Sequence, residues 1–288
     1  MNEVLQKLLL ISLILPIFIS VNAITPSISD SKEVQDSRIK IYSKLKDIPE
    51  SEIERIKKEA IKALYAIPPV LDIEYKKKIK IEIVEKGICR TTREGHIVKL
   101  PIWHIKNKRA PIVHEVTHVV ARKHIDNKFF SEGLAILFQN KFGEDKGGIV
   151  YYKEPQYLSL DSLIIKYRDD LISLYYLKHK NEVFRKIKSA NRKLAYIEAG
   201  SFFKFLYEVY GEHKLQDFYN SRSLDYEKVY GKNIKELEAE WLNYAFKEIP
   251  AKEPATQYSL GMINKNIEES IYWFSLAAEN GHLDARKI

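Results

Sequence analysis

Early in the chain, the pattern of apolar and polar positions predicts one helix and then strands. Apolar side chains recur at helical spacing from Ile53 to Leu64, after Ser51-Glu52-Ile53-Glu54, which is typical of a capping box at a helix start. We expect Pro68 and Pro69 to end this helix, because proline lacks the N–H that an interior helical position uses. Apolar and charged residues then alternate from Ile79 to Ile83, the period of a half-buried strand.

A second extended segment, His96 to Leu100, leads into Pro101. Because proline cannot donate to a strand ladder, this position is typical of an exposed edge strand. Beyond Pro111 the apolar spacing becomes helical, and Gly143 and Gly211 are expected helix ends. The later helical segments are Ile112 to Val120, Leu134 to Phe138, Leu160 to Leu177, Ala199 to Tyr210 and Leu237 to Phe246. The predicted class is α+β: a small N-terminal β-sheet with an edge strand, then a mainly helical domain.

Composition narrows the function classes. The 288 residues are 45% hydrophobic and 11% aromatic, enough to build a core and to exclude a disordered chain. A single cysteine, Cys89, excludes an intramolecular disulfide and a cysteine-rich metal cluster, so a metal would need histidine and carboxylate ligands. The net charge of +8 raises the possibility of nucleic-acid binding. Since the lysines are spread in short runs without a recognised nucleic-acid module, we expect no nucleic-acid partner.

The N-terminus has the layout of a secretory signal peptide. Leu8 to Val21 is almost wholly apolar and ends in Val21-Asn22-Ala23, so we expect cleavage after Ala23 and a periplasmic or secreted protein. The apolar run of about 14 residues is shorter than the roughly 20 that a membrane-spanning helix needs, and Pro16 interrupts it. The alternative is an uncleaved anchor or a buried helix. We expect no membrane span in the mature chain.

Between Pro111 and Gly143 the chain carries a histidine pair with metal-ligand spacing. His114-Glu115-Val116-Thr117-His118 has the pattern H-E-x-x-H on a predicted helix. Residues four apart lie about 6 Å apart along the axis on nearly one face, so both imidazoles can reach one ion. Tetrahedral Zn²⁺ accepts such a pair, and Glu115 is placed to act on a water as general base. The alternative is a pair of buried, hydrogen-bonded histidines.

A catalytic zinc site needs a third protein ligand, and Glu132 is the candidate. It lies in Ser131-Glu132-Gly133-Leu134-Ala135, at the start of the next predicted helix. About eight extended residues cover roughly 26 Å, so the chain can return to the metal, with a turn expected at Asp126-Asn127. Gly133 is expected to let the two helices pack closely beside the ion. The alternative for Glu132 is a first-turn acid favoured by the helix dipole.

The residues from His114 to Phe142 resemble the gluzincin peptidases, most closely the peptidase MA-like group, in which the HExxH helix is followed by an S-E-G-L-A helix. Tyr196 to Gly211 and Tyr230 to Trp241 are similar to later parts of that group, so the resemblance spans roughly residues 96–246. It implies a zincin-type fold and zinc-dependent hydrolysis of a peptide or protein substrate. The implied zinc ligands are His114, His118 and Glu132, and the implied base is Glu115.

The same resemblance implies further site residues. A peptide substrate would add to the edge strand formed by Ile97, Val98, Lys99 and Leu100. Tyr196 would stabilise the tetrahedral intermediate, with ordinary helix packing as the alternative for one of 18 tyrosines. Ile136 stands where some gluzincins carry an acid that orients a histidine, so other groups, such as a backbone carbonyl, have to support the ligands.

The C-terminal residues resemble a Sel-like repeat, a helical hairpin related to the tetratricopeptide repeat. The resemblance lies in Tyr258-Ser259-Leu260-Gly261 and in the stretch from Trp273 to Ala285. Because one such repeat cannot bury its own apolar face, we expect it to dock on the preceding domain or to bind a protein partner through residues 255–288. The alternative is an amphipathic terminal helix packed on the core.

The expected organisation is a signal peptide at 1–23, a linker or N-terminal segment at 24–50, a zincin-like peptidase domain at 51–250 and the Sel-like repeat at 251–288. The rival interpretation is a catalytically weak or inactive zinc-binding protein that acts as an interaction module through the repeat. The presence of Glu115 favours the peptidase, because a structural zinc site is more often closed by a fourth protein ligand.

Overall fold

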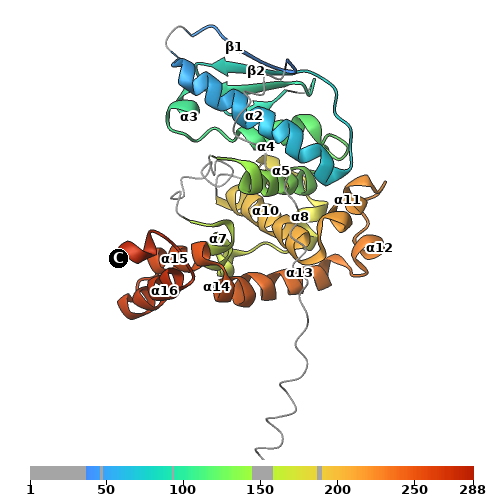
Figure 1. Ribbon diagram of the computed structural model, residues 1–288. Helices are drawn as coiled ribbons and strands as arrows, with labels where there is room; N and C mark the ends of the chain where they lie inside the picture. Colours follow the sequence, from blue (N-terminus) through green and yellow to red (C-terminus); the bar gives the residue numbers. More distant parts are fainter. Residues whose placement is uncertain (1–36, 46–47, 93, 145–157, 187–189) are drawn as a thin grey trace, which may run out of the picture. The chain divides into compact units, whose positions relative to one another are not determined.

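A computed structural model describes residues 37–45, 48–92, 94–144, 158–186 and 190–288 (Figure 1). The predicted signal peptide at 1–23, and the linker up to residue 36, lie outside the described residues. The described part is a mixed α+β fold, mostly helical with one small sheet near its N-terminal end, which confirms the predicted class. None of the helices in these ranges is long and apolar enough to cross a membrane.

The sheet begins the fold and has four strands in the described ranges: β1 (Ile39–Ser43), β2 (Ile79–Val84), β3 (Arg90–Thr91) and β4 (Ile97–Pro101). Their order is β1-β2-β4-β3, with β1, β2 and β4 parallel and β3 antiparallel to β4. Ile81 of β2 pairs with Ile41 on one side and Val98 on the other. The alternation predicted for β2 is confirmed, since its isoleucines are buried and the residues between them are half-buried.

The prediction that Ile97 to Leu100 forms an edge strand is wrong. β4 lies inside the sheet between β2 and β3, and the two edges are β1 and β3. β3 pairs with β4 only through Arg90 with Lys99 and Thr91 with Val98, so a strand of two residues covers this side. Pro101 lies beyond those pairs, and its missing N–H therefore removes no hydrogen bond to β3.

The first helix, α2 (Glu50–Leu71), lies across the sheet (Figure 1). It begins after Pro49 without a side-chain cap, so the capping box predicted at Ser51 does not form. It also continues through Pro68 and Pro69, against the prediction. Both prolines fall in the last turn, where the loss of their N–H groups does not stop the helix, and Asp72 ends it in the left-handed conformation (φ 50°, ψ 55°).

Helices form the rest of the fold. The first group is α3 (Ile102–Lys106), α4 (Ile112–Val120), α5 (Lys128–Phe142), α7 (Leu160–Lys166), α8 (Leu174–His179) and α9 (Glu182–Lys186). The second group is α10 (Ala190–Tyr210), α11 (Glu212–Asn220), α12 (Tyr226–Tyr230) and α13 (Ile234–Asn243). Gly143 and Gly211 follow the ends of α5 and α10, as predicted.

The continuous helix expected from Leu160 to Leu177 is instead interrupted. A short 3-10 turn at Arg168–Asp170 and an extended link separate α7 from α8. Carboxyl groups from distant helices accept hydrogen bonds from the amides after α7: Glu198 Oε1 accepts from Ile172 N at 2.9 Å, and Glu238 Oε1 accepts from Leu174 N at 3.0 Å. These tertiary hydrogen bonds replace the intrahelical ones that the apolar spacing predicts.

Glycines bring α5 and α10 into close contact. A side chain at Gly133 of α5 would meet Phe203 and the carbonyl oxygen of Ala199 on α10, and one at Gly200 of α10 would meet Ile136 on α5. Gly133 therefore allows α5 to approach α10, rather than α4 as the sequence suggested. Around this contact the phenylalanine rings of the two helices pack at centroid distances of 5.1–6.0 Å.

The C-terminal helices form a hairpin. After α13 the chain passes through a π-helical turn (Tyr244–Glu248) into α14 (Ile249–Lys252), and then into α15 (Pro254–Ile263) and α16 (Ile267–Glu279). The helix breaks at Glu253, directly before Pro254. Gly261 of α15 lies against Phe274 of α16. A helical hairpin is thus present, and its identity as a Sel-like repeat stays a prediction.

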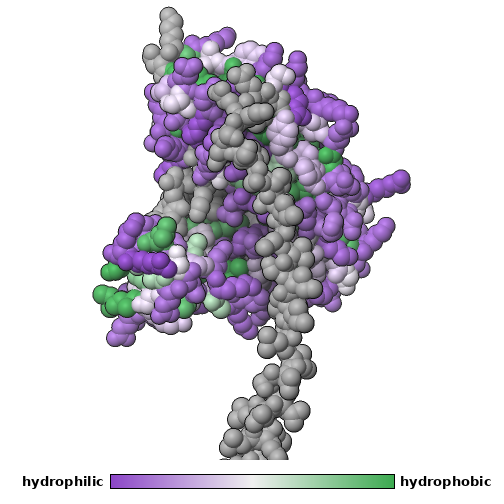
Figure 2. Space-filling model, viewed as in Figure 1, coloured by the Kyte–Doolittle hydropathy of each residue, from purple (hydrophilic) through white to green (hydrophobic). Residues whose placement is uncertain are grey.

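Helix α15 docks the hairpin on α7. The hydroxyls of Ser159 and Thr256 are 2.7 Å apart, and Ser259 Oγ accepts from Ser159 N at 3.2 Å. Helix α16 lies outside α15, and Figure 2 shows apolar side chains at the surface of this part of the molecule. The most exposed in α16 are Ile267, Ile271 and Tyr272, with 75%, 59% and 58% of their surface accessible. A protein-binding role for residues 255–288 stays a prediction.

Candidate metal centre

Helix α4 presents both histidines from a buried position. Every residue from Ile112 to Val120 is buried, so α4 passes through the core with His114 and His118 on the face toward α5. The start of the helix is fixed from α5, because His114 N donates to Gln139 Oε1 at 2.9 Å. The i,i+4 spacing, which predicted that the two histidines can reach one metal ion, thus lies on a rigid helix.

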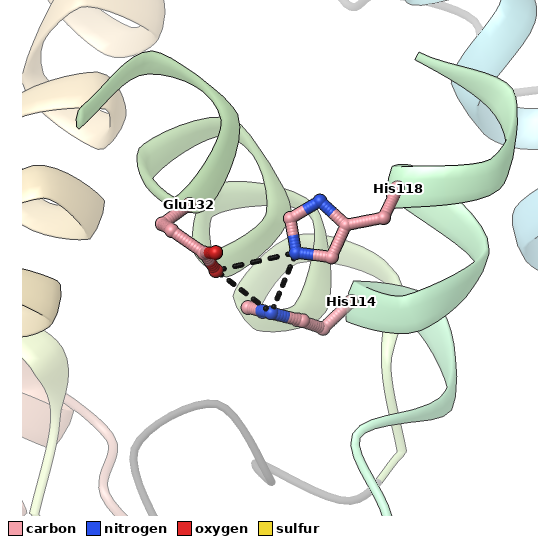
Figure 3. A group of neighbouring side chains, drawn as sticks. All are labelled: His114, His118 and Glu132. Carbon is pink, nitrogen blue, oxygen red and sulfur yellow. Dashed lines mark hydrogen bonds and ion pairs between the residues drawn. The ribbon is translucent and has the colours of Figure 1, made fainter. Parts of the chain in front are cut away.

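The start of α5 sets the position of Glu132. Asn127 caps this helix by accepting from Phe130 N at 3.0 Å, as expected for a turn at Asp126-Asn127. Asn181 reinforces the cap: its Oδ1 accepts from Lys128 N at 2.9 Å, and its Nδ2 donates to Asp126 O at 3.0 Å. Glu132 then lies a little more than one turn into α5, and its side chain points toward α4 (Figure 3).

The three predicted ligands meet in one buried triangle (Figure 3). The Nε2 atoms of His114 and His118 are 3.1 Å apart, and each is 3.2 Å from Glu132 Oε2. Zinc–ligand bonds of about 2.0–2.1 Å at tetrahedral angles place ligand atoms roughly 3.3–3.4 Å apart. The triangle therefore fits one face of a zinc tetrahedron. Among the described residues this is the one group of three or more such side chains that could hold a metal ion.

The surroundings of Glu132 favour its ionised form. Burial alone disfavours the ionised carboxyl, but the charges and hydrogen bonds of His118 and His114 outweigh it and hold the pKa of Glu132 well below its usual value. The exposed fractions of the three residues are 6%, 8% and 6%. A carboxylate buried this deeply needs positive partners: Lys128 Nζ lies 3.7 Å from Oε1, and a metal ion would face Oε2.

Glu115 is a buried carboxyl close to His114 and Glu132. Burial raises the pKa of Glu115 to about 7, with His114 acting in the opposite direction and Glu132 adding to the rise. A carboxyl with a pKa near neutrality can both accept and release a proton at pH 7. This is the property expected of the predicted base.

Thr91, which the sequence did not single out, orients Glu115. Its hydroxyl is 3.0 Å from Glu115 Oε2 and 2.9 Å from Glu115 O, so the edge strand β3 is tied to both the side chain and the backbone of α4. A lone threonine in a strand of two residues carries no motif, and this contact depends on tertiary packing. Thr91 could therefore not be found from the sequence.

Tyr196 lies on α10, close enough for the charges of Glu132 and Glu115 to act on its hydroxyl. Burial, followed by the negative charge of Glu132, raises its pKa, and Arg192 acts in the opposite direction. The ring of Tyr196 also packs against Phe184 at a centroid distance of 5.5 Å. Tyr196 thus has the neighbours that its predicted role requires as well as ordinary packing contacts, and that role stays a prediction.

The structure does not support the predicted substrate strand β4 or the predicted carbonyl partner of a ligand histidine. Val98 and Leu100 are fully buried, and β3 covers β4, so a peptide cannot join β4 as predicted. No described residue accepts a hydrogen bond from His114 Nδ1, which is buried, so the carbonyl partner expected for a ligand histidine is not seen there. Ile136 is occupied with Gly200 of α10, which explains why an apolar residue stands at this position.

Searches against models of protein families, curated proteins and solved structures find no match to this chain. The resemblance to gluzincin peptidases therefore stays a prediction, and the functional argument depends on the geometry of the site.

Proposed function

We propose that this protein is a zinc-dependent peptide hydrolase. The observation that carries the proposal is the buried triangle of His114, His118 and Glu132, with the carboxyl of Glu115 beside it at a pKa of about 7. Three protein ligands leave a fourth position for a reactant, which is the arrangement of catalytic rather than structural zinc sites.

The side chains have separate tasks in this proposal. His114, His118 and Glu132 would hold the ion, which when bound lowers the pKa of a water ligand toward 7 and polarises a carbonyl. Glu115 takes the proton from the attacking water and returns it to the leaving amine, and Thr91 keeps its carboxylate oriented. Tyr196 would donate its hydroxyl proton in a hydrogen bond to the oxygen that gains negative charge.

A peptide substrate is supported by the sheet. β3 is the edge strand on the site's side of β4, and Thr91 links this strand directly to Glu115. Its outer backbone groups can pair with an extended chain, so a peptide added there would lie next to the proposed base. The strand proposed for substrate addition is therefore β3, in place of β4.

The proposal is tested by metal analysis and peptide cleavage on the same samples. We expect about one zinc per chain and cleavage of a mixed peptide library that chelation abolishes. Glu115→Gln should retain zinc and lower the cleavage rate by about 100-fold or more, since general base catalysis contributes about 10²–10⁴-fold. Glu227→Gln, on the exposed side of α12, is the matched control and should behave as wild type.

Three results would contradict parts of the proposal. If the wild-type protein contains no zinc, the proposed metal site is refuted. If Glu115→Gln retains zinc and cleaves peptides at the wild-type rate, Glu115 is not the general base. Zinc binding without cleavage of any peptide by the wild type favours the rival interpretation, a zinc-binding protein without catalysis.

A further inference from the structure

The two carboxylate oxygens of Glu132 face different surroundings. Oε2 points at both imidazoles, 3.2 Å from each Nε2 atom. Oε1 instead faces the ammonium group of Lys128, with Nζ at 3.7 Å. The Lys128 side chain is three-quarters buried, so the ammonium and the carboxylate interact where water screens them little.

Lys128 occupies a position where a helix disfavours a cation. It is the first residue of α5, and the positive end of the helix dipole lies there. A lysine that precedes its glutamate by four residues is also the weaker order for a helical ion pair. Helix stability alone therefore does not account for this residue, whereas its contact with Glu132 does.

The backbone holds Lys128 at this place. Its N–H donates to Asn181 Oδ1, and Asn127 caps the same turn. Since side chains on a helix lean toward its N-terminus, the carboxylate of Glu132 leans back toward Lys128, one turn earlier. The capped first turn of α5 and the backward lean of the Glu132 side chain thus bring the ammonium group and Oε1 together.

We propose that Lys128 is a positioning residue that keeps Glu132 a one-oxygen metal ligand. By holding Oε1, Lys128 leaves only Oε2 for the ion, next to the two imidazoles. The inference rests on the proposed function, because it presumes zinc in the triangle. Its consequence is that a coordination position, which a second carboxylate oxygen would fill, stays open for water and substrate.

The test is X-ray absorption spectroscopy of the full chain loaded with zinc alone. Wild type should show two imidazole nitrogens and oxygen neighbours to a total of about four ligands. Lys128→Met and Lys128→Gln should each gain one oxygen neighbour, giving about five ligands, and lose peptide cleavage by about 10–100-fold. Lys128→Arg, which keeps the charge, should restore the wild-type spectrum.

Lys141→Met is the matched control. Lys141 lies on the same helix α5, where its ammonium group is 4.6 Å from the Tyr207 ring centroid, and its loss should leave the zinc spectrum unchanged. Wild-type spectra in both neutral variants of Lys128, with zinc bound, would overturn the inference and leave the proposed function intact. A wild-type chain without two imidazole ligands would overturn both.

Discussion

Gly133→Ala tests whether the contact between α5 and α10 fixes Glu132. A Cβ at this position would lie 2.5 Å from Phe203 Cδ2 and 2.8 Å from the carbonyl oxygen of Ala199. Since ordinary contacts begin near 3.4 Å, the ring must withdraw by about 0.9 Å and the backbone of α10 by about 0.6 Å. A ring can rotate away, but a helix carbonyl cannot move alone, so the two helices must separate.

Two measurable effects follow from this separation. Overpacking costs about 1–3 kcal/mol, and the better helix propensity of alanine offsets about 1 kcal/mol, so we expect a net loss of up to about 2 kcal/mol in the free energy of unfolding. Because Glu132 is the preceding residue, a shift of α5 also moves Oε2 relative to the imidazoles. We expect zinc affinity to fall by about 10–100-fold, as when a residue that orients a ligand is lost.

The assays are urea denaturation of the metal-free protein and zinc titration against a chromophoric chelator. Gly261→Ala is the matched control, because its Cβ would lie 2.6 Å from Phe274 Cε1 in the C-terminal hairpin. It should lose stability but bind zinc as wild type does. If Gly133→Ala retains wild-type zinc affinity while its stability falls, the contact between α5 and α10 does not set the position of Glu132.

Three further predictions concern buried polar groups. Burial raises the pKa of Glu198 to about 9, so the folded state binds more protons than the unfolded state above the ordinary glutamate pKa, and stability falls by up to about 1.4 kcal/mol per pH unit up to pH 9. Glu198→Gln should remove this pH dependence of the free energy of unfolding, measured by urea denaturation at pH 5 and pH 8. An equal change between the two pH values in wild type and variant would refute the prediction. Lys204→Met leaves the buried Asp161 carboxylate, 2.6 Å away in the wild type, without its cation and should cost roughly 3–5 kcal/mol by the same assay; a loss below 1 kcal/mol would contradict this. Thr91→Val removes a hydrogen bond to the charged form of Glu115, so the acid limb of the cleavage rate should move up by about one pH unit with zinc retained, and superimposable pH profiles would exclude this role.

The parts of the site that could be predicted are those that depend on local spacing. His114 and His118 share a face of α4 because four residues make about one helical turn, and Glu132 could be reached by chain length alone. The alternation in β2 and the helix end at Gly143 are equally local. Each of these features is set by neighbours within a few turns or strand residues.

The features that were missed depend on distant parts of the chain. β3 has only two residues, too few to show a period, so nothing in the sequence revealed that it covers β4. The link after α7 is extended because Glu198 and Glu238 take its amides, although the apolar spacing there is helical. Thr91 reaches Glu115 across 24 positions of sequence. In each case a tertiary contact overrides the local pattern.

All three metal-binding candidates fall within one continuous stretch, from His114 to Glu132, on the adjacent helices α4 and α5. Closing so short a loop costs little chain entropy, and a local pair of helices forms faster than a parallel pairing such as that of β1 with β2. During synthesis this stretch emerges before α10 and the C-terminal hairpin. If the triangle binds zinc as proposed, metal capture would therefore precede completion of the fold, and the ion would act as a template on which the later helices assemble.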